Sequence, residues 1–291
     1  MQSKSVTKYI LLLPALLVLA ATTIYPFFSA LILSFRYWRM NKSPVPGKFV
    51  GFDNYLRAFS DPNFWNSMVV TLRFTLISVL LTILLALVMA IFLRQNNRAN
   101  YFFRTLLILP FAMAPVLKGY TWKFMLNDFY GIYDFIIDHL LPFAADINWL
   151  GDPFWAQFWL AMTEVWGWAP YIALVFIGAL SVIPQETLDA AEIDGCNNWQ
   201  KIRHVMIPQI MPVILIMTLL KTIYSLKMFD AVVSLTGGGP GRATETLNYF
   251  VYKTGFRFFD MGYASALAWI LVFIFFIFAM LYERTLMREG R

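Results

Sequence analysis

The chain offers few side chains for nucleophilic or acid–base chemistry. It has one cysteine, Cys196, and two histidines, His139 and His204. A catalytic nucleophile needs a base within hydrogen-bond reach, but the topology derived below places the two histidines on opposite sides of a membrane. A lone cysteine also leaves no thiol pair for a disulfide, a metal or a redox site. The sequence therefore favours a protein that is not an enzyme and that holds no metal.

A glycine run in the last third of the chain does not provide nucleotide chemistry either. The run Gly237, Gly238, Gly239 and Pro240 lacks the lysine and the following helix of a phosphate-binding loop. We interpret it as an external turn within a Gly-rich loop at about residues 234–246. ATP hydrolysis by this chain is not expected, and no residue pattern indicates a bound cofactor.

Two apolar segments each carry polar and aromatic residues along one helical face. Positions i, i+3, i+4 and i+7 share a face of an α-helix. These positions are Glu164, Gly167, Trp168 and Tyr171 in one segment, and Lys221, Tyr224, Ser225 and Met228 in the other. Because charges in hydrocarbon are costly, the two faces predict a cavity whose aromatic rings and polar groups would bind a solute. The alternative is that the rings pack between helices and that Lys221 extends to the membrane surface.

Three further lysines lie within or beside apolar segments. They are Lys118, Lys123 and Lys227. A long aliphatic stem lets an ammonium group reach the membrane surface, and we predict that all three do so.

The elements that must position these residues are membrane helices. Hydrophobic residues make up 59% of the chain and charged residues 14%, which is too apolar for a soluble protein of this length. A helix needs about 20 residues to cross a hydrocarbon core of ~30 Å, and backbone groups in lipid must pair within their own helix. The sequence thus predicts an all-α polytopic membrane protein with one transmembrane domain over residues 1–291. Its six predicted spans are Tyr9–Phe35, Met68–Leu93, Phe102–Met125, Phe154–Leu180, Pro208–Val233 and Met261–Tyr282.

Loop charges predict the orientation of these spans. Acidic residues without basic companions fill the connection between the third and fourth spans, which we therefore place outside: Asp128, Asp134, Asp138, Asp146 and Asp152. Both termini then lie in the cytoplasm, in agreement with a small excess of Lys and Arg on that side. The first external loop, with five basic residues, favours the opposite orientation. The net charge of +6 is spread among apolar runs and does not indicate nucleic-acid binding.

The most informative loop connects the fourth and fifth spans, at about residues 183–208. Pro184 can open a short helix, Gly195 can close it with a left-handed residue, and Asn198 can cap a second helix. The small pair Ala190-Ala191 on the first helix would let another protein approach closely. From the residues alone, an ordinary amphipathic cytoplasmic loop is an equal alternative.

The same loop resembles the EAA loop of binding-protein-dependent ABC importer permeases. That pattern is Glu-Ala-Ala, three residues, Gly, nine residues and then Ile-x-Leu-Pro. The chain has Asp189, Ala190 and Ala191, then Gly195, and then Val205 to Pro208 at the same spacings. Asp189, Val205 and Ile207 depart from the pattern but keep its chemical type, although the shorter carboxylate reduces the reach of a salt bridge.

Other stretches along the chain resemble the carbohydrate-type permeases of this family. These stretches are Leu13-Pro14, Tyr25-Pro26, Gly51 to Trp65, Arg104 to Pro110 and Thr236 to Thr246. The start of the chain is more similar to the maltose F-type and glycerol-phosphate A-type subunits than to their partner subunits. One departure is Val70, before Thr71, where the family often has Asn.

This resemblance implies the type I ABC importer permease fold in a bacterial inner membrane. It also implies a second, non-identical permease subunit, a dimeric ABC ATPase that holds ATP and Mg²⁺, and a periplasmic solute-binding protein. The loop would dock in a cleft of the ATPase with Asp189 facing a basic residue, so that Asp189, Ala190, Ala191, Gly195 and Pro208 couple ATP-driven motion to the pore. The Gly-rich loop would face the binding protein. A secondary transporter or channel that works without an ATPase is the alternative, and co-purification of an ATPase would distinguish the two.

Alignment with the maltose-type F subunit implies that the two polar faces line a sugar site. At the position of Lys221 the neutral-sugar permease carries a small hydroxyl residue. The lysine suggests a solute with a negative group, such as a sulfonated, phosphorylated or carboxylated sugar derivative. The alternative is that Glu164 neutralises Lys221 and leaves the cavity neutral.

Overall fold

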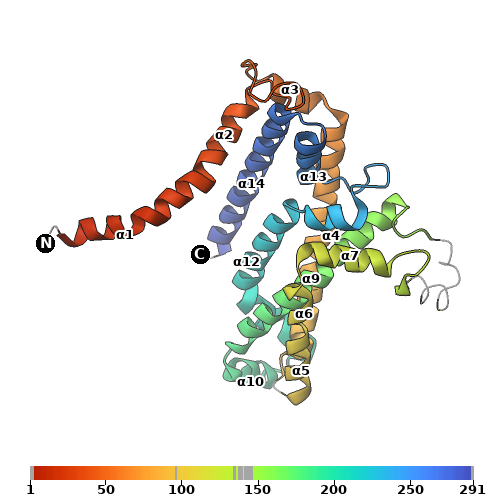
Figure 1. Ribbon diagram of the computed structural model, residues 1–291. Helices are drawn as coiled ribbons and strands as arrows, with labels where there is room; N and C mark the ends of the chain where they lie inside the picture. Colours follow the sequence, from red (N-terminus) through yellow and green to blue (C-terminus); the bar gives the residue numbers. More distant parts are fainter. Residues whose placement is uncertain (1–2, 96, 134–135, 137–139, 141–146, 290–291) are drawn as a thin grey trace. The chain divides into compact units, whose positions relative to one another are not determined.

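The computed structural model describes residues 3–95, 97–133, 136, 140 and 147–289, and for residues 3–10, 281 and 283–289 it describes the backbone. Helices dominate the described chain (Figure 1). Two compact units can be distinguished. One joins the segment up to Trp65 with Phe250–Ile274, and the other joins Asn66–Tyr249 with the segment from Phe275. One domain over residues 1–291 stays a prediction.

Five helical segments of the described chain are long and apolar enough to cross a membrane, and one bent pair of helices would make a sixth span. The predicted all-α polytopic class is therefore confirmed. The five segments are Leu11–Ser34, Pro62–Leu93, Pro153–Ser181, Asn198–Leu226 and Met261–Met280.

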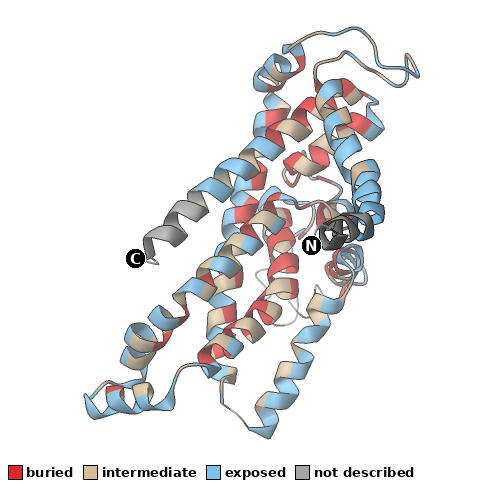
Figure 2. Cartoon of the chain, turned by 90° about the vertical axis from the view of Figure 1, so that its left-hand side faces the viewer, coloured by how far each residue is buried: buried red, intermediate tan, exposed pale blue. Residues whose placement is uncertain are grey.

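The first unit begins with a long helical run. α1 (Ser3–Leu19), a π-helical turn (Ala20–Ile24) and α2 (Tyr25–Ser34) follow one another directly. No residue in the most apolar window of this run is buried within the chain, and its ribbon is accordingly coloured as exposed in Figure 2. Most of its apolar side chains are left to contact lipid or other subunits, although Phe27 packs on Trp269 with 4.6 Å between the ring centroids.

The end of α2 is held by a buried polar group on α3 (Asp53–Ser60). Asn54, 6% exposed, donates its side-chain amide to the backbone oxygens of Ser34 at 2.8 Å and Arg36 at 3.0 Å. The last carbonyl groups of a helix have no intrahelical partner. Asn54 therefore supplies donors that the C-terminal end of α2 lacks.

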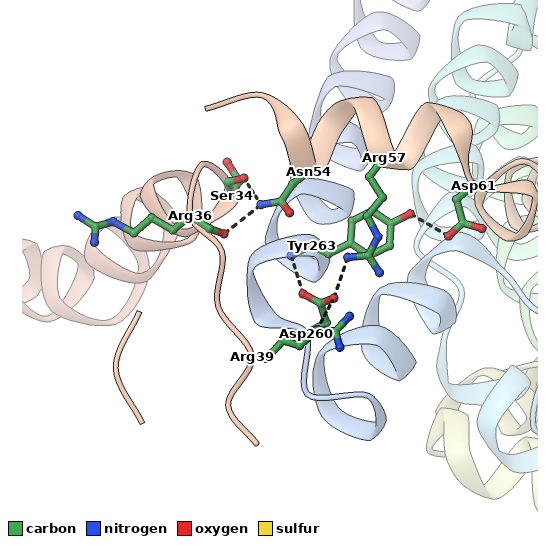
Figure 3. Close-up of polar contacts among 8 residues, drawn as sticks. All are labelled: Ser34, Arg36, Arg39, Asn54, Arg57, Asp61, Asp260 and Tyr263. Carbon is green, nitrogen blue, oxygen red and sulfur yellow. Dashed lines mark hydrogen bonds and ion pairs between the residues drawn. The ribbon is translucent and has the colours of Figure 1, made fainter. Parts of the chain in front are cut away.

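A buried carboxylate joins the start of α14 (Met261–Glu289) to α3 and to the loop after α2, as Figure 3 shows. Asp260, 4% exposed, accepts from Arg57 at 2.8 Å and lies 3.4 Å from Nε of Arg39. The guanidinium group of Arg57 also covers the Tyr263 ring, 3.9 Å from its centroid. The Tyr263 hydroxyl donates to Asp61 at 3.0 Å. Asp260 thus neutralises two arginines that come from different segments.

The second unit contains the helices that carry the predicted sites. Its main elements are α4 (Pro62–Leu93), α5 (Arg98–Leu106), α6 (Ile108–Ala112), α7 (Pro115–Met125), α9 (Pro153–Ser181), α10 (Gln185–Ile193), α11 (Asn198–Gln200) and α12 (Ile207–Leu226). α9 is the most deeply buried of the spanning helices, with 67% of its apolar window enclosed. α6, α7 and α12 all contact α9.

The apolar core of the second unit joins α4, α9 and α12. Small residues on α4, Ala86 and Ala90, pack with Ala173 and Phe176 of α9 and with Ile210 of α12. All five side chains are almost fully buried. Because alanine has a short side chain, the helices can approach closely at this level.

The prediction of one continuous third span is wrong. α5 and α6 run to Ala112, and α7 starts at Pro115 after a bend of 99°. The residue before a proline avoids the helical conformation for steric reasons, and Ala114 is indeed extended, with φ −58° and ψ 137°. The apolar run across Pro115 concealed this break.

The predicted fifth span is displaced at both ends. Helical structure begins at Asn198, continues through a π-helical segment (Lys201–Met206) into α12, and ends at Leu226. A separate π-helical segment, Val232–Thr236, follows. The second helix of the loop and the fifth span are therefore one continuous rod.

Removing the carboxylate of Asp260 should destabilise the first unit. We expect Asp260→Ala to cost about 1–3 kcal/mol, because it leaves two arginines without their acceptor and half-exposed arginines are partly solvated. Thermal unfolding of the purified protein in detergent measures the loss. Asp53→Asn, a change of an exposed carboxylate on α3, is the matched control, and an equal effect of both changes would contradict the role of Asp260.

Candidate solute-binding cavity and coupling loop

The second unit contains an open cavity of about 430 Å³. Its walls come from α6 and α7, from α9, and from the end of α12 with the residues that follow. The lining residues are Phe111, Met113, Pro115, Lys118, Glu164, Trp168, Tyr224, Lys227, Met228, Phe229 and Asp230. The break between α6 and α7 therefore lies at the cavity. Met113 and Pro115, the residues at this break, form part of its wall.

A buried ion pair lies beside this cavity. Nζ of Lys221 on α12 lies 3.1 Å from Oε2 of Glu164 on α9, and the two side chains are 0% and 8% exposed. The ring of Trp168 covers the ammonium group, with 5.2 Å between Nζ and the ring centroid. Lys221 does not line the cavity, whereas Glu164 does. Of the two hypotheses for Lys221, the structure agrees with neutralisation by Glu164.

Aromatic rings form much of the remaining wall. Trp168 and Tyr224 come from different helices, and their ring centroids are 4.7 Å apart. Phe111 contacts Trp168 edge to face at 5.4 Å. Tyr171 stacks on Phe111 at 4.1 Å and supports that ring without lining the cavity. Such a wall offers flat apolar faces together with a few polar groups.

The structure brings together about half of the residues predicted for the solute path. Glu164, Trp168, Tyr224 and Met228 line the cavity. Lys221 and Ser225 are fully buried behind it. Their role in binding a solute stays a prediction.

The sequence did not reveal seven of the lining residues, which are Phe111, Met113, Pro115, Lys118, Lys227, Phe229 and Asp230. We predicted that Lys118 reaches the membrane surface, and this is wrong because the side chain is 5% exposed and lines the cavity. It fits there because Gly167 has no side chain, since a Cβ at Gly167 would lie 2.8 Å from Nζ of Lys118. Lys123 and Lys227 are exposed. Spacing could have placed Lys118 only if the break at Pro115 had been recognised.

The loop at residues 183–208 has the expected helix, turn and helix. α10 begins directly after Pro184, and Gly195 ends it with a left-handed φ of +82°, so both predicted roles are confirmed. The amides of Gly195 and Cys196 bond to Glu192 and Ala191 oxygens at 3.0 and 2.9 Å. The second helix is capped one residue earlier than predicted.

That cap consists of two reciprocal hydrogen bonds between Asn197 and Gln200. The side chain of Asn197 accepts from the amide of Gln200, and the side chain of Gln200 accepts from the amide of Asn197. Satisfying both groups fixes the start of the rod that continues into α12. The loop and the membrane helix are thereby joined without a flexible linker.

The exposed face of α10 carries the residues singled out in the sequence. Asp189 and Ala190 are exposed, whereas Ala191 is buried against the chain. Asp189 accepts from the side chain of Gln185 at 2.8 Å, which leaves carboxylate lone pairs for another partner. Figure 1 shows α10 as a short helix set off at the end of α9.

The Gly-rich loop is tightly held by threonine hydroxyls. Thr244 donates to the Gly239 oxygen and bonds to the hydroxyl of Thr236, both at 2.7 Å. Thr246 donates to the backbone oxygen of Met228, a residue of the cavity wall, at 3.0 Å. Gly238 has φ +87°, and a Cβ there would lie 2.7 Å from the Tyr249 ring. The loop is therefore a defined structure connected to the cavity.

The candidate catalytic groups do not form a site among the described residues. His204 is exposed within Lys201–Met206, and His139 lies outside the described residues. No group of three or more His, Cys, Asp and Glu side chains with the geometry for a metal occurs in the described part of the chain.

Residues 62–286 match a family model described as "Binding-protein-dependent transport system inner membrane component". The chain belongs to this family. The family name and the spanning helices agree with a location in the inner membrane. A permease of this kind is a transport component and not itself a catalyst. The family that the EAA-like loop predicted is therefore confirmed.

Two relatives and one solved structure align with nearly the whole chain. The chain is 32% identical to the trehalose/maltose transport system permease protein MalF of Thermococcus litoralis, over 91% of this chain and 88% of that protein. It is 29% identical to the sulfoquinovosyl glycerol transport system permease protein SmoG of Agrobacterium fabrum, over 90% and 84%. A bacterial ABC transporter involved in the import of the acidic polysaccharide alginate has the same fold, with a TM-score of 0.85, 17% identity and coverage of 99% and 98%.

Removing either partner of the Glu164–Lys221 ion pair should destabilise the permease, but by different amounts. Glu164→Gln leaves Lys221 fully buried and unpaired, and we expect a loss of about 3–5 kcal/mol. Lys221→Met should cost less, because Lys118 is close enough to interact electrostatically with Glu164. Thermal unfolding of the single variants and of the double variant Glu164→Gln/Lys221→Met measures the coupling. If the double variant lost the sum of the two single losses, the pair would have no energetic role.

Proposed function

We propose that the chain is one of two non-identical permease subunits of an ATP-driven importer for a carbohydrate-like solute. The observation that carries this proposal is the cavity, where Trp168, Tyr224 and Phe111 offer aromatic faces beside charged groups. Aromatic faces suit the apolar faces of sugar rings, and polar groups suit hydroxyls. The names of MalF and SmoG, which transport sugars or a sugar derivative, support this class of solute.

The solute is delivered from outside and released into the cytoplasm. In our proposal a periplasmic binding protein docks near the Gly-rich loop, and both termini of the permease lie in the cytoplasm. The family description supports a binding protein as partner. The connection from Thr246 to Met228 gives that loop a direct mechanical contact with the cavity wall.

Energy for transport comes from a separate dimeric ATPase, which binds ATP and Mg²⁺. We propose that it holds α10 in a cleft, in contact with Asp189 and Ala190. Large apolar side chains beside this face support a docking role, because Ile193 is 87% and Trp199 65% exposed. The rigid connection from the capped turn into α12 would transmit closure of the ATPase to the helices that line the cavity.

Co-purification tests this proposal against a transporter that works alone. The tagged permease is expressed with the ATPase, the second permease and the binding protein encoded beside it, and is purified in detergent. We expect the ATPase and the second permease to co-purify and uptake of solute by proteoliposomes to require ATP inside. ATP-independent uptake by the permease alone would support a secondary transporter or channel.

Gly195 should be required for coupling and not for solute recognition. A β-branched residue strongly disfavours positive φ, at a cost of about 1–2 kcal/mol or more, so Gly195→Val should lower uptake roughly tenfold. Nothing in this chain lies within 4 Å of a Cβ at Gly195, so crowding within the permease cannot cause the loss. Gly195→Asn is the matched control, because asparagine tolerates this conformation.

Uptake and ATPase stimulation by the loaded binding protein are measured for both variants. The binding protein should still bind solute in each assay. Normal uptake and normal stimulation in Gly195→Val would contradict the proposed role of the turn.

The Gly-rich loop should tolerate a small side chain but not a bulky one. Gly239→Trp should impair uptake while the complex still assembles, because the ring would obstruct the surface that receives the binding protein. Gly239→Ala is the control, since its Cβ meets only the Thr236 oxygen at an ordinary 3.5 Å. If Gly239→Trp prevented assembly with the ATPase, the loop would be a structural element only.

A further inference from the structure

The N-terminal end of α7 opens at the cavity. Met113 and Pro115, the residues on either side of the start of this helix, both line it. The first amide groups of a helix have no intrahelical acceptor, and the aligned peptide dipoles make this end positive. Helix N-termini therefore favour bound anions. The bend of 99° before α7 is what directs this end toward the cavity.

Lys118 adds an ammonium group at the same place. It lies one turn into α7, is 5% exposed and lines the cavity. Within the described part of the chain its ammonium group has neither a hydrogen bond nor an ion pair within 4.0 Å. Its neighbours are Gly167, the face of the Phe111 ring, 5.9 Å away, and the Glu164 carboxylate, which attracts it from beyond ion-pair distance. A buried ammonium group that no carboxylate approaches within ion-pair distance is costly unless a ligand or water meets it.

The charges around the cavity do not cancel. Its acidic lining residues are Glu164 and Asp230, and its basic ones are Lys118 and Lys227. Glu164, however, already forms the ion pair with Lys221, which lies behind the wall. Counting Lys221, three basic side chains therefore face two carboxylates, and Lys118 is the buried one of the two lysines that line the cavity.

We propose that Lys118 and the N-terminal turn of α7 form a subsite for an anionic group of the transported solute. The group is a carboxylate, sulfonate or phosphate carried by a sugar-like body, which rests against Trp168 and Tyr224. This proposal rests on the proposed function, because it names the charge of the solute that the same cavity takes. It assigns the anion to Lys118, whereas Lys221 serves to neutralise Glu164.

Thiol-modification rates can measure the potential in this subsite directly. Cys196→Ser removes the single native cysteine, and Met113→Cys then places one thiol in the cavity wall. The complete complex in proteoliposomes is treated with methanethiosulfonates that are anionic (sulfonatoethyl), cationic (trimethylammonioethyl) or neutral (methyl). We expect an anion-to-cation rate ratio about tenfold above that of free mercaptoethanol, because a unit charge a few ångströms away acts in a medium of reduced dielectric constant.

Variants assign this preference to a residue. Lys118→Gln should lower the anion-to-cation ratio by about tenfold. Lys123→Gln, a change of an exposed lysine on the same helix outside the cavity, should leave it unchanged. The rate with the neutral reagent reports whether a variant keeps the folded cavity, because it responds to access and not to charge.

Three results would overturn the proposal. The first is an anion-to-cation ratio no higher than that of mercaptoethanol in the protein with Cys196→Ser and Met113→Cys. This result does not depend on whether a lysine variant folds. The second is a Lys118→Gln variant that has a normal neutral rate and an unchanged ratio. The third is an equal fall in Lys118→Gln and Lys123→Gln. Failure of the proposed transport function would appear separately, as uptake that does not require ATP, and it would leave these ratios unaltered.

Discussion

A buried charge is costly in hydrocarbon unless a partner, water or a ligand meets it, and the Glu164–Lys221 pair satisfies that condition in the second unit. The pair fixes how α9 and α12 face each other, because neither helix can rotate or slide without separating the charges. The Trp168 ring shields one side of the ammonium group. The alanine-rich packing with α4 holds the same two helices further along. The position of the cavity wall on both helices follows from this pairing.

Irregular backbone borders the cavity on two sides. α6 and α7 are interrupted at Met113 and Ala114, and α12 ends at Leu226 just before the residues that line the opposite wall. In a membrane, unpaired backbone groups are tolerated only where protein or a polar cavity surrounds them. The interruptions and the polar residues therefore occur together for one physical reason.

Loop features were more predictable from the sequence than the cavity was. Pro184 and Gly195 act through local backbone preferences, so their roles could be predicted from residue type and spacing alone. The Glu164–Lys221 pair could be proposed as one of two alternatives, because helical periodicity places both on polar faces. Distinguishing the alternatives required the distance between two helices, which spacing within one helix does not determine.

The position of Lys118 in the cavity could not be predicted, because it depends on contacts between distant parts of the chain. Its position depends on a bend at Pro115 and on the missing side chain of Gly167, a residue on another helix. Hydropathy averages over a window and passes across a single proline, so the third span was expected to be straight. Long-range packing of this kind leaves no periodic signal in the sequence.

The arrangement of the first unit has a consequence for how the chain is made. Arg39 and Arg57 belong to the first part of the chain, whereas their common carboxylate, Asp260, is near its end. All of residues 66–249 must be synthesised in between. At roughly 5–20 residues per second, that delay is on the order of 10–40 s. During this interval the first helix is already available for insertion while both arginines lack their counter-ion, so the first unit can be completed only after the helices of the second have emerged.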